Sequence, residues 1–253
     1  MSRIKFMNTE IDNYTMEEAL QAIDELILRN RNAYVVTPNV DHLIQLERGG
    51  ELVEAYRYAD LILTDGKPLI WISRWYGTPI KEKISGSDLF PHLCAKAAEK
   101  GYRMFFLGAA EGVAATAARN LKTKYPGLQV AGTYSPPKGF EKDDAEMDKI
   151  CKMIIDTAPH ILIVALGCPK QECFILHNRE RLGVPLSLGL GASLDFEAGY
   201  IKRAPRWMAD HGLEWLYRIT QDPKRLAKRY LIDDMKIIRL ALKYKPRKPM
   251  SQQ

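Results

Sequence analysis

Short apolar runs alternate with segments of helical pattern along roughly the first 195 residues. The runs are rich in β-branched side chains, which is typical of strands buried on both faces of a parallel sheet. They lie at Ala33–Val36, Leu61–Leu63, Met104–Leu107, Leu128–Val130, Ile161–Leu166 and Pro185–Leu188. The helical segments lie at Met16–Arg29, Lys67–Trp75, Leu89–Lys100, Val113–Lys124, Asp143–Thr157 and Gln171–Leu182. This alternation predicts an α/β fold with an open, mostly parallel, Rossmann-like sheet and helices on both faces.

The pattern changes after about Gly199. Two segments, Pro205–Tyr217 and Pro223–Leu242, have helical character and open at a proline, which is favoured in a first helical turn. Among the dense Lys and Arg of the second segment runs an apolar stripe of Leu226, Tyr230, Ile237, Leu240 and Ala241. We therefore expect an α/β catalytic domain over residues 1–198 and a basic helical appendage over residues 199–253.

The charge of the chain divides in the same place. The 253 residues carry a net charge of +6, but residues 198–253 carry +9 and the remainder −3. A basic region on a slightly acidic domain indicates binding to a polyanion such as anionic lipid, phosphate or nucleic acid. The four cysteines show neither metal-type spacing nor a disulfide framework, and no apolar run is long enough to span a bilayer. The start of the chain turns acidic too early for a signal peptide, so we expect a cytoplasmic protein.

Candidate chemistry gathers where predicted strands end. The sequences there are VVTPNVDH, LILTDGKP, FFLGAAEGVA, IVALGCPKQE and LSLGLGASLDF. Ligands of open α/β sheets bind beyond the carboxyl ends of the strands. The sequence therefore predicts a binding site built from these loops.

Three polar residues in the loops have both a functional and a structural interpretation. Thr37 can face a ligand or cap the helix that Pro38 begins. Asp65 can accept a proton from an attacking hydroxyl, or cap a helix. Gln171 can hydrogen-bond a sugar hydroxyl or a diphosphate oxygen, or simply belong to a polar first turn.

The glycine patterns point to phosphate only weakly. Gly108 opens the turn GAAEG, which would let backbone N–H groups approach a phosphate, but the ending of a P-loop is missing. Gly189-Leu190-Gly191 is an incomplete dinucleotide fingerprint. The sequence also has no Asp-x-Asp, no zinc spacing and no Gly-x-Ser-x-Gly, and its five histidines are scattered. We therefore expect neither a metal nor a cofactor.

Taken in order, seven segments resemble one family across nearly the whole chain. They are TPNVDH, LTDGKPLIW, ISGSDLF, FFLGAAEGVA, LGCPKQE, GLGASLDFEAG and RAPRWMADHGLEWLYRITQDPKRLAKRYL. These segments resemble the bacterial WecG/TagA/CpsF glycosyltransferases, which serve wall teichoic acid, enterobacterial common antigen, capsule and exopolysaccharide synthesis. The resemblance implies an inverting, metal-independent transfer from a UDP-sugar to an undecaprenyl-diphosphate-linked sugar.

The resemblance also implies roles for matching positions. Asp65 would be the general base that deprotonates the acceptor hydroxyl, with Thr37 and Gln171 beside the reacting sugar and diphosphate. Asn39 and Asp195 would help to hold the nucleotide.

Basic residues complete the implied site. Arg218, Arg225 and Lys228 of the appendage would close over it and meet the diphosphates. Lys83 stands where the family often has arginine, so a phosphate contact there would lose the bidentate geometry. Lys228 also stands where arginine is expected, and Thr64 replaces a small residue before Asp65.

Without a metal, fixed cations and helix N-termini would have to stabilise the leaving diphosphate. The basic appendage supplies such cations, and it would also draw the protein to the anionic cytoplasmic face of the plasma membrane. A nucleotide- or nucleic-acid-binding protein without transferase activity is the alternative, although no recognition motif accompanies the charge. An NAD enzyme is opposed by the incomplete fingerprint. A homo-oligomer remains open, as do the donor sugar and the acceptor.

Overall fold

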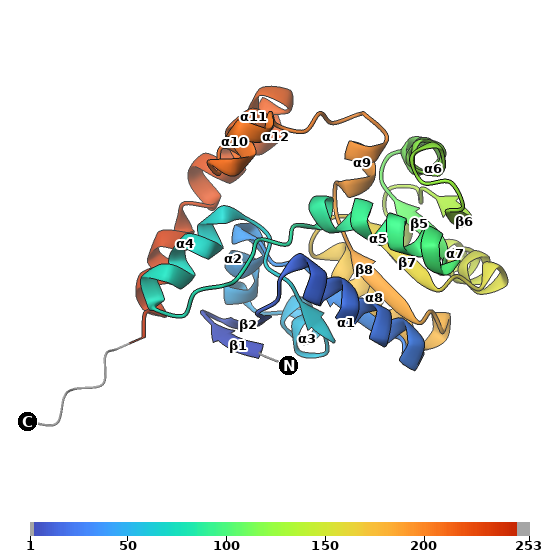
Figure 1. Cartoon of the computed structure of the whole chain (residues 1–253), viewed down its shortest axis with the longest axis horizontal. Coiled ribbons are helices and arrows are strands. Elements are labelled where there is room, and N and C mark those ends of the chain that lie inside the picture. Colours follow the sequence, from blue (N-terminus) through green and yellow to red (C-terminus); the bar gives the residue numbers. More distant parts are fainter. Residues whose placement is uncertain (1–2, 247–253) are drawn as a thin grey trace, which may run out of the picture.

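The computed structural model describes residues 3–246, with Arg206, Asp210 and Arg225 described by their backbone alone. Its centre is a six-stranded sheet in the order β4-β3-β8-β7-β5-β6, and every neighbouring pair in it is parallel (Figure 1). The strands are β3 (Ala33–Val36), β4 (Leu61–Ile62), β5 (Arg103–Gly108), β6 (Gln129–Tyr134), β7 (Ile161–Ala165) and β8 (Leu186–Gly189). The predicted open parallel sheet is confirmed.

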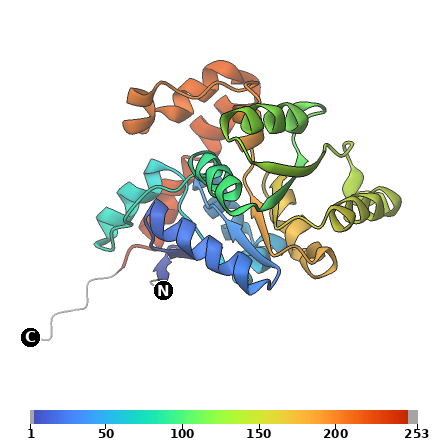
Figure 2. The same ribbon diagram turned by 45° about the vertical axis from the view of Figure 1, so that its right-hand side comes forward.

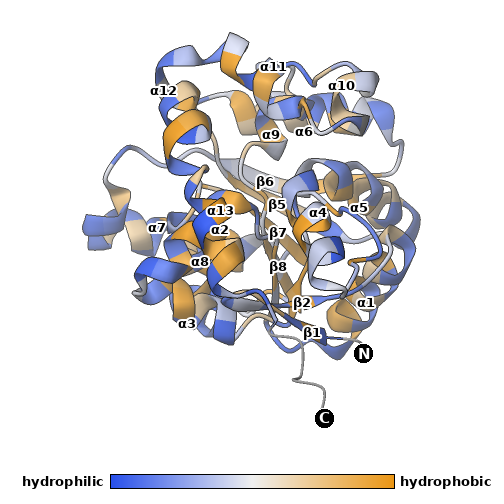
Figure 3. Ribbon diagram, turned by 90° about the vertical axis from the view of Figure 1, so that its left-hand side faces the viewer, coloured by the Kyte–Doolittle hydropathy of each residue, from blue (hydrophilic) through white to orange (hydrophobic). Residues whose placement is uncertain are grey.

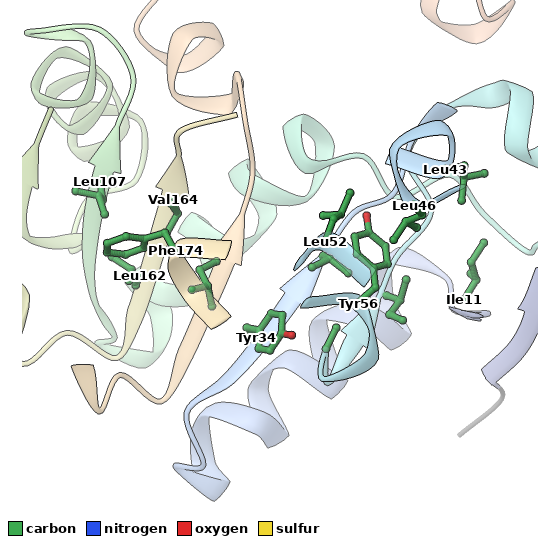
Figure 4. Close-up of a cluster of buried hydrophobic side chains, with 14 of the residues drawn as sticks. Ile11, Tyr34, Leu43, Leu46, Leu52, Tyr56, Leu107, Leu162, Val164 and Phe174 are labelled. Atoms are coloured by element: carbon green, nitrogen blue, oxygen red, sulfur yellow. The ribbon is translucent and has the colours of Figure 1, made fainter. Parts of the chain in front are cut away.

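Helices cover both faces of the sheet because strand side chains alternate between two apolar layers. Tyr34 and Val36 of β3 enter one layer, whereas Ala33 and Val35 enter the other. The first layer, part of which Figure 4 shows, is completed by α2 (Val40–Arg48), α3 (Glu51–Arg57), α4 (Lys67–Tyr76), α7 (Asp144–Thr157) and α8 (Lys170–Leu182). The second is completed by α1 (Met16–Arg29), α5 (Gly86–Lys100), α6 (Val113–Lys124) and α9 (Ser193–Glu197).

Local capping explains where the helices begin and end. Thr15 and Glu18 form a reciprocal capping box before α1, and Asn30 ends that helix in the left-handed conformation. The helix α5 begins three residues before the predicted Leu89, because the Ser85 side chain accepts the Asp88 N–H as its N-cap.

The apolar pattern did not predict several short elements. Strands β1 (Arg3–Phe6) and β2 (Thr9–Asp12) form an antiparallel hairpin outside the main sheet. Asp12 fixes it in place, because its carboxylate pairs with Arg3 at 2.9 Å and accepts the N–H of Ile62 at 2.9 Å. The helices α2 and α3, and a 3₁₀ turn at Phe140–Lys142, were not predicted either.

The C-terminal region is more broken than the two helices predicted from sequence. It consists of α10 (Arg206–Asp210), α11 (Glu214–Gln221), α12 (Pro223–Lys228), a π-helix (Arg229–Asp233) and α13 (Lys236–Lys243). Gly212 separates α10 from α11 with a φ of +73°, and a Cβ there would lie 2.9 Å from the ring of Trp71. Figures 1 and 2 show these helices arching from α9 over the sheet edge and returning beside α4.

The last helix, α13, belongs to the core of the protein. Ile237, Leu240 and Ala241 pack into the layer of α2 and α4, and the Tyr76 hydroxyl donates to the Ala241 carbonyl at 2.6 Å. The predicted apolar stripe therefore faces protein on this helix. Another set of apolar side chains faces solvent, namely Leu231, Ile232, Met235, Ile238 and Leu242. Within residues 3–246, no helix is long and apolar enough to cross a bilayer.

Candidate active site

The loops after β3 and β4 bring Thr37 and Asp65 to the same part of the sheet edge. The Asp65 N–H donates to the Pro38 carbonyl at 2.8 Å, which ties the two loops together. Thr37 is buried and Asp65 is partly buried. Neither residue caps a helix, because Asn39 is the N-cap of α2 and Gly66 that of α4. The structural interpretation of both residues as caps is therefore wrong.

The surroundings of Asp65 suit a group that accepts a proton near neutral pH. Burial raises the pKa of its carboxyl to about 6; the positive charge of Lys83 opposes this rise and the negative charge of Glu214 adds to it. Arg218, from the C-terminal region, also lowers the pKa of Asp65. A carboxylate with this pKa is mostly ionised at pH 7 yet more basic than an exposed aspartate.

Lys83 is held beside Asp65 by a charged cluster. Its ammonium contacts the Asp88 carboxylate at 2.6 Å, and Arg203 reaches the other oxygen of Asp88 at 3.1 Å. Burial acts to lower the pKa of Lys83, but Asp88 outweighs this effect and leaves the pKa raised. Pro91 has no N–H for the Ser87 carbonyl one turn earlier, and Arg203 donates to that carbonyl instead.

A cleft of about 900 Å³ opens beside this cluster. It lies between α5 and the C-terminal helices, and its charged lining includes Lys67, Lys83, Asp88, Arg203 and Glu214. The cleft offers a polar space with several cations on its walls, and two of its lining residues, Lys83 and Glu214, act electrostatically on Asp65.

Gln171 joins the loops that follow β7 and β8. Its Oε1 accepts the Gly191 N–H at 3.0 Å, and its Nε2 donates to Glu172 at 2.8 Å. A Cβ at Gly189 would lie 2.9 Å from that Nε2, which explains why glycine is needed at this position. The buried amide therefore does more than fill a polar first turn, because it fixes the relative positions of two loops at the sheet edge.

The remaining predicted residues lie in different surroundings. A Cβ at Gly108 would come within 2.5 Å of the Ala165 carbonyl, so close strand packing requires this glycine.

Arg218 lies over the ring of Phe196 at 5.8 Å, and its Nε is buried with no hydrogen-bond partner among the described residues. Asp195 precedes Phe196 in α9, and Lys228 is exposed at the end of α12. Arg225 lies in α12, but its side chain is outside the described part.

Sequence comparison identifies the family. The profile of the glycosyl transferase WecG/TagA/CpsF family matches residues 4–251. The chain belongs to the WecG/TagA/CpsF family. Among its curated relatives is an N-acetylglucosaminyldiphosphoundecaprenol N-acetyl-beta-D-mannosaminyltransferase of Bacillus spizizenii, 35% identical over 89% of this chain and 84% of the relative. Proteins of the same name from Bacillus subtilis and Staphylococcus aureus are 30% and 27% identical, over 88% and 90% of this chain and 83% and 88% of those relatives.

Several charged residues of this WecG/TagA/CpsF member were missed by the sequence reasoning. Asp88 and Glu214 lie within segments that carry the family resemblance, but nothing in the sequence indicates that both act on Asp65. Arg229, which the sequence reasoning did not single out, contacts Asp41 of α2 at 3.4 Å.

Proposed function

We propose that this protein transfers N-acetylmannosamine from a UDP-linked donor to N-acetylglucosaminyl-diphosphoundecaprenol, with inversion, in teichoic acid synthesis. The names of the curated relatives support this acceptor and this sugar. Their names also specify a β-linked product, and a β product from an α-linked UDP-sugar requires inversion at the anomeric carbon. A single displacement with one general base gives that outcome.

The observation that carries the proposal is the environment of Asp65. In the transfer step, the acceptor hydroxyl oxygen bonds to the anomeric carbon while the bond from that carbon to the UDP oxygen breaks. The hydroxyl proton passes to Asp65, and UDP leaves with the bonding electrons. A partly buried carboxylate with a pKa of about 6 is well matched to this proton.

The leaving diphosphate gains negative charge as the bond breaks. We assign its stabilisation to protein cations, because the sequence has no Asp-x-Asp that would bridge a metal to the diphosphate. Lys83 and Arg218 both act electrostatically on Asp65, so they are near the reacting atoms. The buried Nε of Arg218, without a partner among the described residues, is a donor available to a phosphate oxygen. Arg225 and Lys228 would add charge from the same side, while Thr37, Asn39, Gln171 and Asp195 would hold the sugar and nucleotide.

The acceptor lies in a membrane, and the outer face of the C-terminal region suits contact with one. Figure 3 shows apolar residues in the stretch that runs from the end of α12 through α13, beside α2. The exposed residues Leu231, Ile232, Met235, Ile238 and Leu242 would enter the lipid interface, with the surrounding Lys and Arg meeting anionic headgroups. This arrangement would make the enzyme a peripheral protein of the cytoplasmic membrane face.

The test is a transfer assay with a panel of UDP-sugars and a short lipid-diphosphate-linked N-acetylglucosamine acceptor. UDP-N-acetylmannosamine should give a β-linked disaccharide without any added divalent cation. Asp65→Asn should reduce the transfer rate by at least about 100-fold, because the general base is lost, while UDP affinity changes little. Turnover of another UDP-sugar alone would overturn the assignment of the donor. An equal loss of rate and UDP affinity would make Asp65 a binding residue.

A further inference from the structure

Three potential metal ligands meet below the first turns of α2 and α8. They are His42 in α2, Cys168 in the loop after β7 and Glu172 in α8, and their ligand atoms all lie within 4.8 Å of one another. The transfer chemistry assigned to Asp65 uses none of the three. The spacing of the cysteines in the sequence gave no sign of this cluster, because its three residues come from two distant segments and only one of them is a cysteine.

The cluster contains a buried carboxylate with unmet bonding capacity. Glu172 is 0% exposed, and its Oε1 accepts from Gln171. Its Oε2 is buried without a hydrogen-bond partner among the described residues. A buried carboxylate is unfavourable unless a positive charge or hydrogen-bond donors compensate it. A cation between Glu172, His42 and Cys168 would supply that compensation.

The imidazole of His42 is oriented as a metal ligand would be. Its Nδ1 lies 2.6 Å from the Tyr56 hydroxyl, which fixes the ring and leaves Nε2 available. A hydrogen bond at the second ring nitrogen is the usual outer support of a metal-bound histidine. Cys168 is partly buried and packs against the apolar layer that also contains Tyr56, and its thiol interacts with the Glu172 side chain.

We propose that His42, Cys168 and Glu172 bind a Zn²⁺ ion. One nitrogen, one sulfur and one oxygen ligand form a set that zinc accepts readily, and three protein ligands leave a fourth position for water. Tetrahedral zinc would hold the three ligand atoms about 3.5 Å from one another. Since these atoms already lie within 4.8 Å of one another, each distance between them would need to shorten by about 1 Å at most.

The ion would position residues of the active site. The backbone N–H of His42 donates to the side chain of Asn39, and the carboxylate of Glu172 accepts from the side chain of Gln171. A zinc ion on His42 and Glu172 would therefore join the first turns of α2 and α8 and hold Asn39 and Gln171 in register. This role is distinct from binding the donor diphosphate.

The test is the metal content of the full chain, purified without a metal-chelating tag from cells grown with zinc. Mass spectrometry should find about one zinc per chain, and Co²⁺ substituted for zinc should show thiolate-to-metal charge-transfer absorption. His42→Ala, Cys168→Ser and Glu172→Gln should each weaken zinc binding by more than about 100-fold. Cys173→Ser is the matched control, since Cys173 follows Glu172 in α8 but is not part of the cluster.

Two outcomes would overturn the proposal. One is wild-type protein that neither retains zinc nor gives the cobalt–thiolate absorption on titration, a result that does not depend on whether any variant folds. The other is zinc content in Cys168→Ser equal to that of Cys173→Ser. Neither measurement uses the transfer assay, so the metal site and the proposed reaction can fail separately.

Discussion

At the scale of single residues, the features that suit Asp65 to the proposed role of general base also make it a source of instability. Its folded pKa of about 6 lies above the ordinary value of 3.8, so the folded state binds this proton more tightly than the unfolded state does. The stability that the protonated carboxyl contributes is fully present below about pH 4 and is lost as the pH rises through about 6. The proposed transfer therefore requires the less stable, ionised form of Asp65.

Asp65→Asn should accordingly stabilise the protein at pH 8 while it abolishes transfer. We expect the free energy of unfolding to rise by about 1–2 kcal/mol, a figure reduced for the partial exposure of the group. Urea unfolding at pH 8 and at pH 4 measures the effect. The gain should vanish at pH 4, and an equal gain at both pH values would refute the electrostatic cause.

Lys83 keeps the pKa of Asp65 lower than burial alone would make it. Removing its charge should therefore change how the transfer rate depends on pH. Because the positive charge of Lys83 lowers the pKa of Asp65, Lys83→Met should move the acidic limb of kcat/KM to higher pH. Lys83→Arg keeps the charge and is the control, whose acidic limb should stay in place. An unchanged limb in Lys83→Met would assign the pH dependence to another group.

The sequence identified several site residues but could not resolve their partners. Thr37, Asp65 and Gln171 follow apolar strands, which is enough to place them at one sheet edge. The contacts of Asp65 with the charges of Lys83, Glu214 and Arg218 depend on how distant segments fold together. The hydrogen bond from Gly191 to Gln171 is likewise a tertiary contact.

At the scale of elements, strong local signals predicted boundaries well. The pattern gave Met16–Arg29 and Val113–Lys124 with their observed limits. It failed where tertiary contacts decide the structure, as in the hairpin that Asp12 attaches to Ile62. The pattern also joined α10 and α11 into one predicted helix. The helical periodicity of the sequence continues through Gly212, where the chain actually breaks and packs close to Trp71.

The helix α13 offers a comparison of two leucines on opposite sides of one element. Leu240 is 8% exposed in the core layer, whereas Leu242 is 62% exposed. Leu240→Ala should lower the free energy of unfolding by about 2–4 kcal/mol, and Leu242→Ala should change it by less than about 0.5 kcal/mol. Denaturant unfolding of both variants measures this, and equal effects would mean that α13 does not pack as described.

At the scale of the whole molecule, the chain combines a near-neutral sheet domain with a basic, partly apolar outer surface. Residues 198–253 hold a charge of +9 against −3 elsewhere. Under the proposed function, this separation of charge would orient one side of the molecule toward a negatively charged surface.

Binding to anionic liposomes should therefore depend on both salt and the exposed apolar residues. The double variant Leu231→Glu/Ile238→Glu should sediment with such vesicles at least about 10-fold less than wild type, because it places negative charge at the lipid interface. Leu28→Glu/Ile155→Glu alters two other exposed apolar residues, on α1 and α7, and is the control. Raising the salt concentration should weaken wild-type binding. Equal sedimentation of the two double variants would remove this surface from the membrane contact.

The two-sided packing of α13 has a kinetic consequence under the proposed function. The same helix is anchored to the core by Leu240 and turns Leu242 outward, so the catalytic domain would be rigidly attached to the membrane-bound surface and would stay at the bilayer. The enzyme would then encounter its acceptor by two-dimensional diffusion, and the mole fraction of acceptor in the lipid would govern turnover. Diluting the acceptor with inert phospholipid would slow the reaction even at constant bulk concentration.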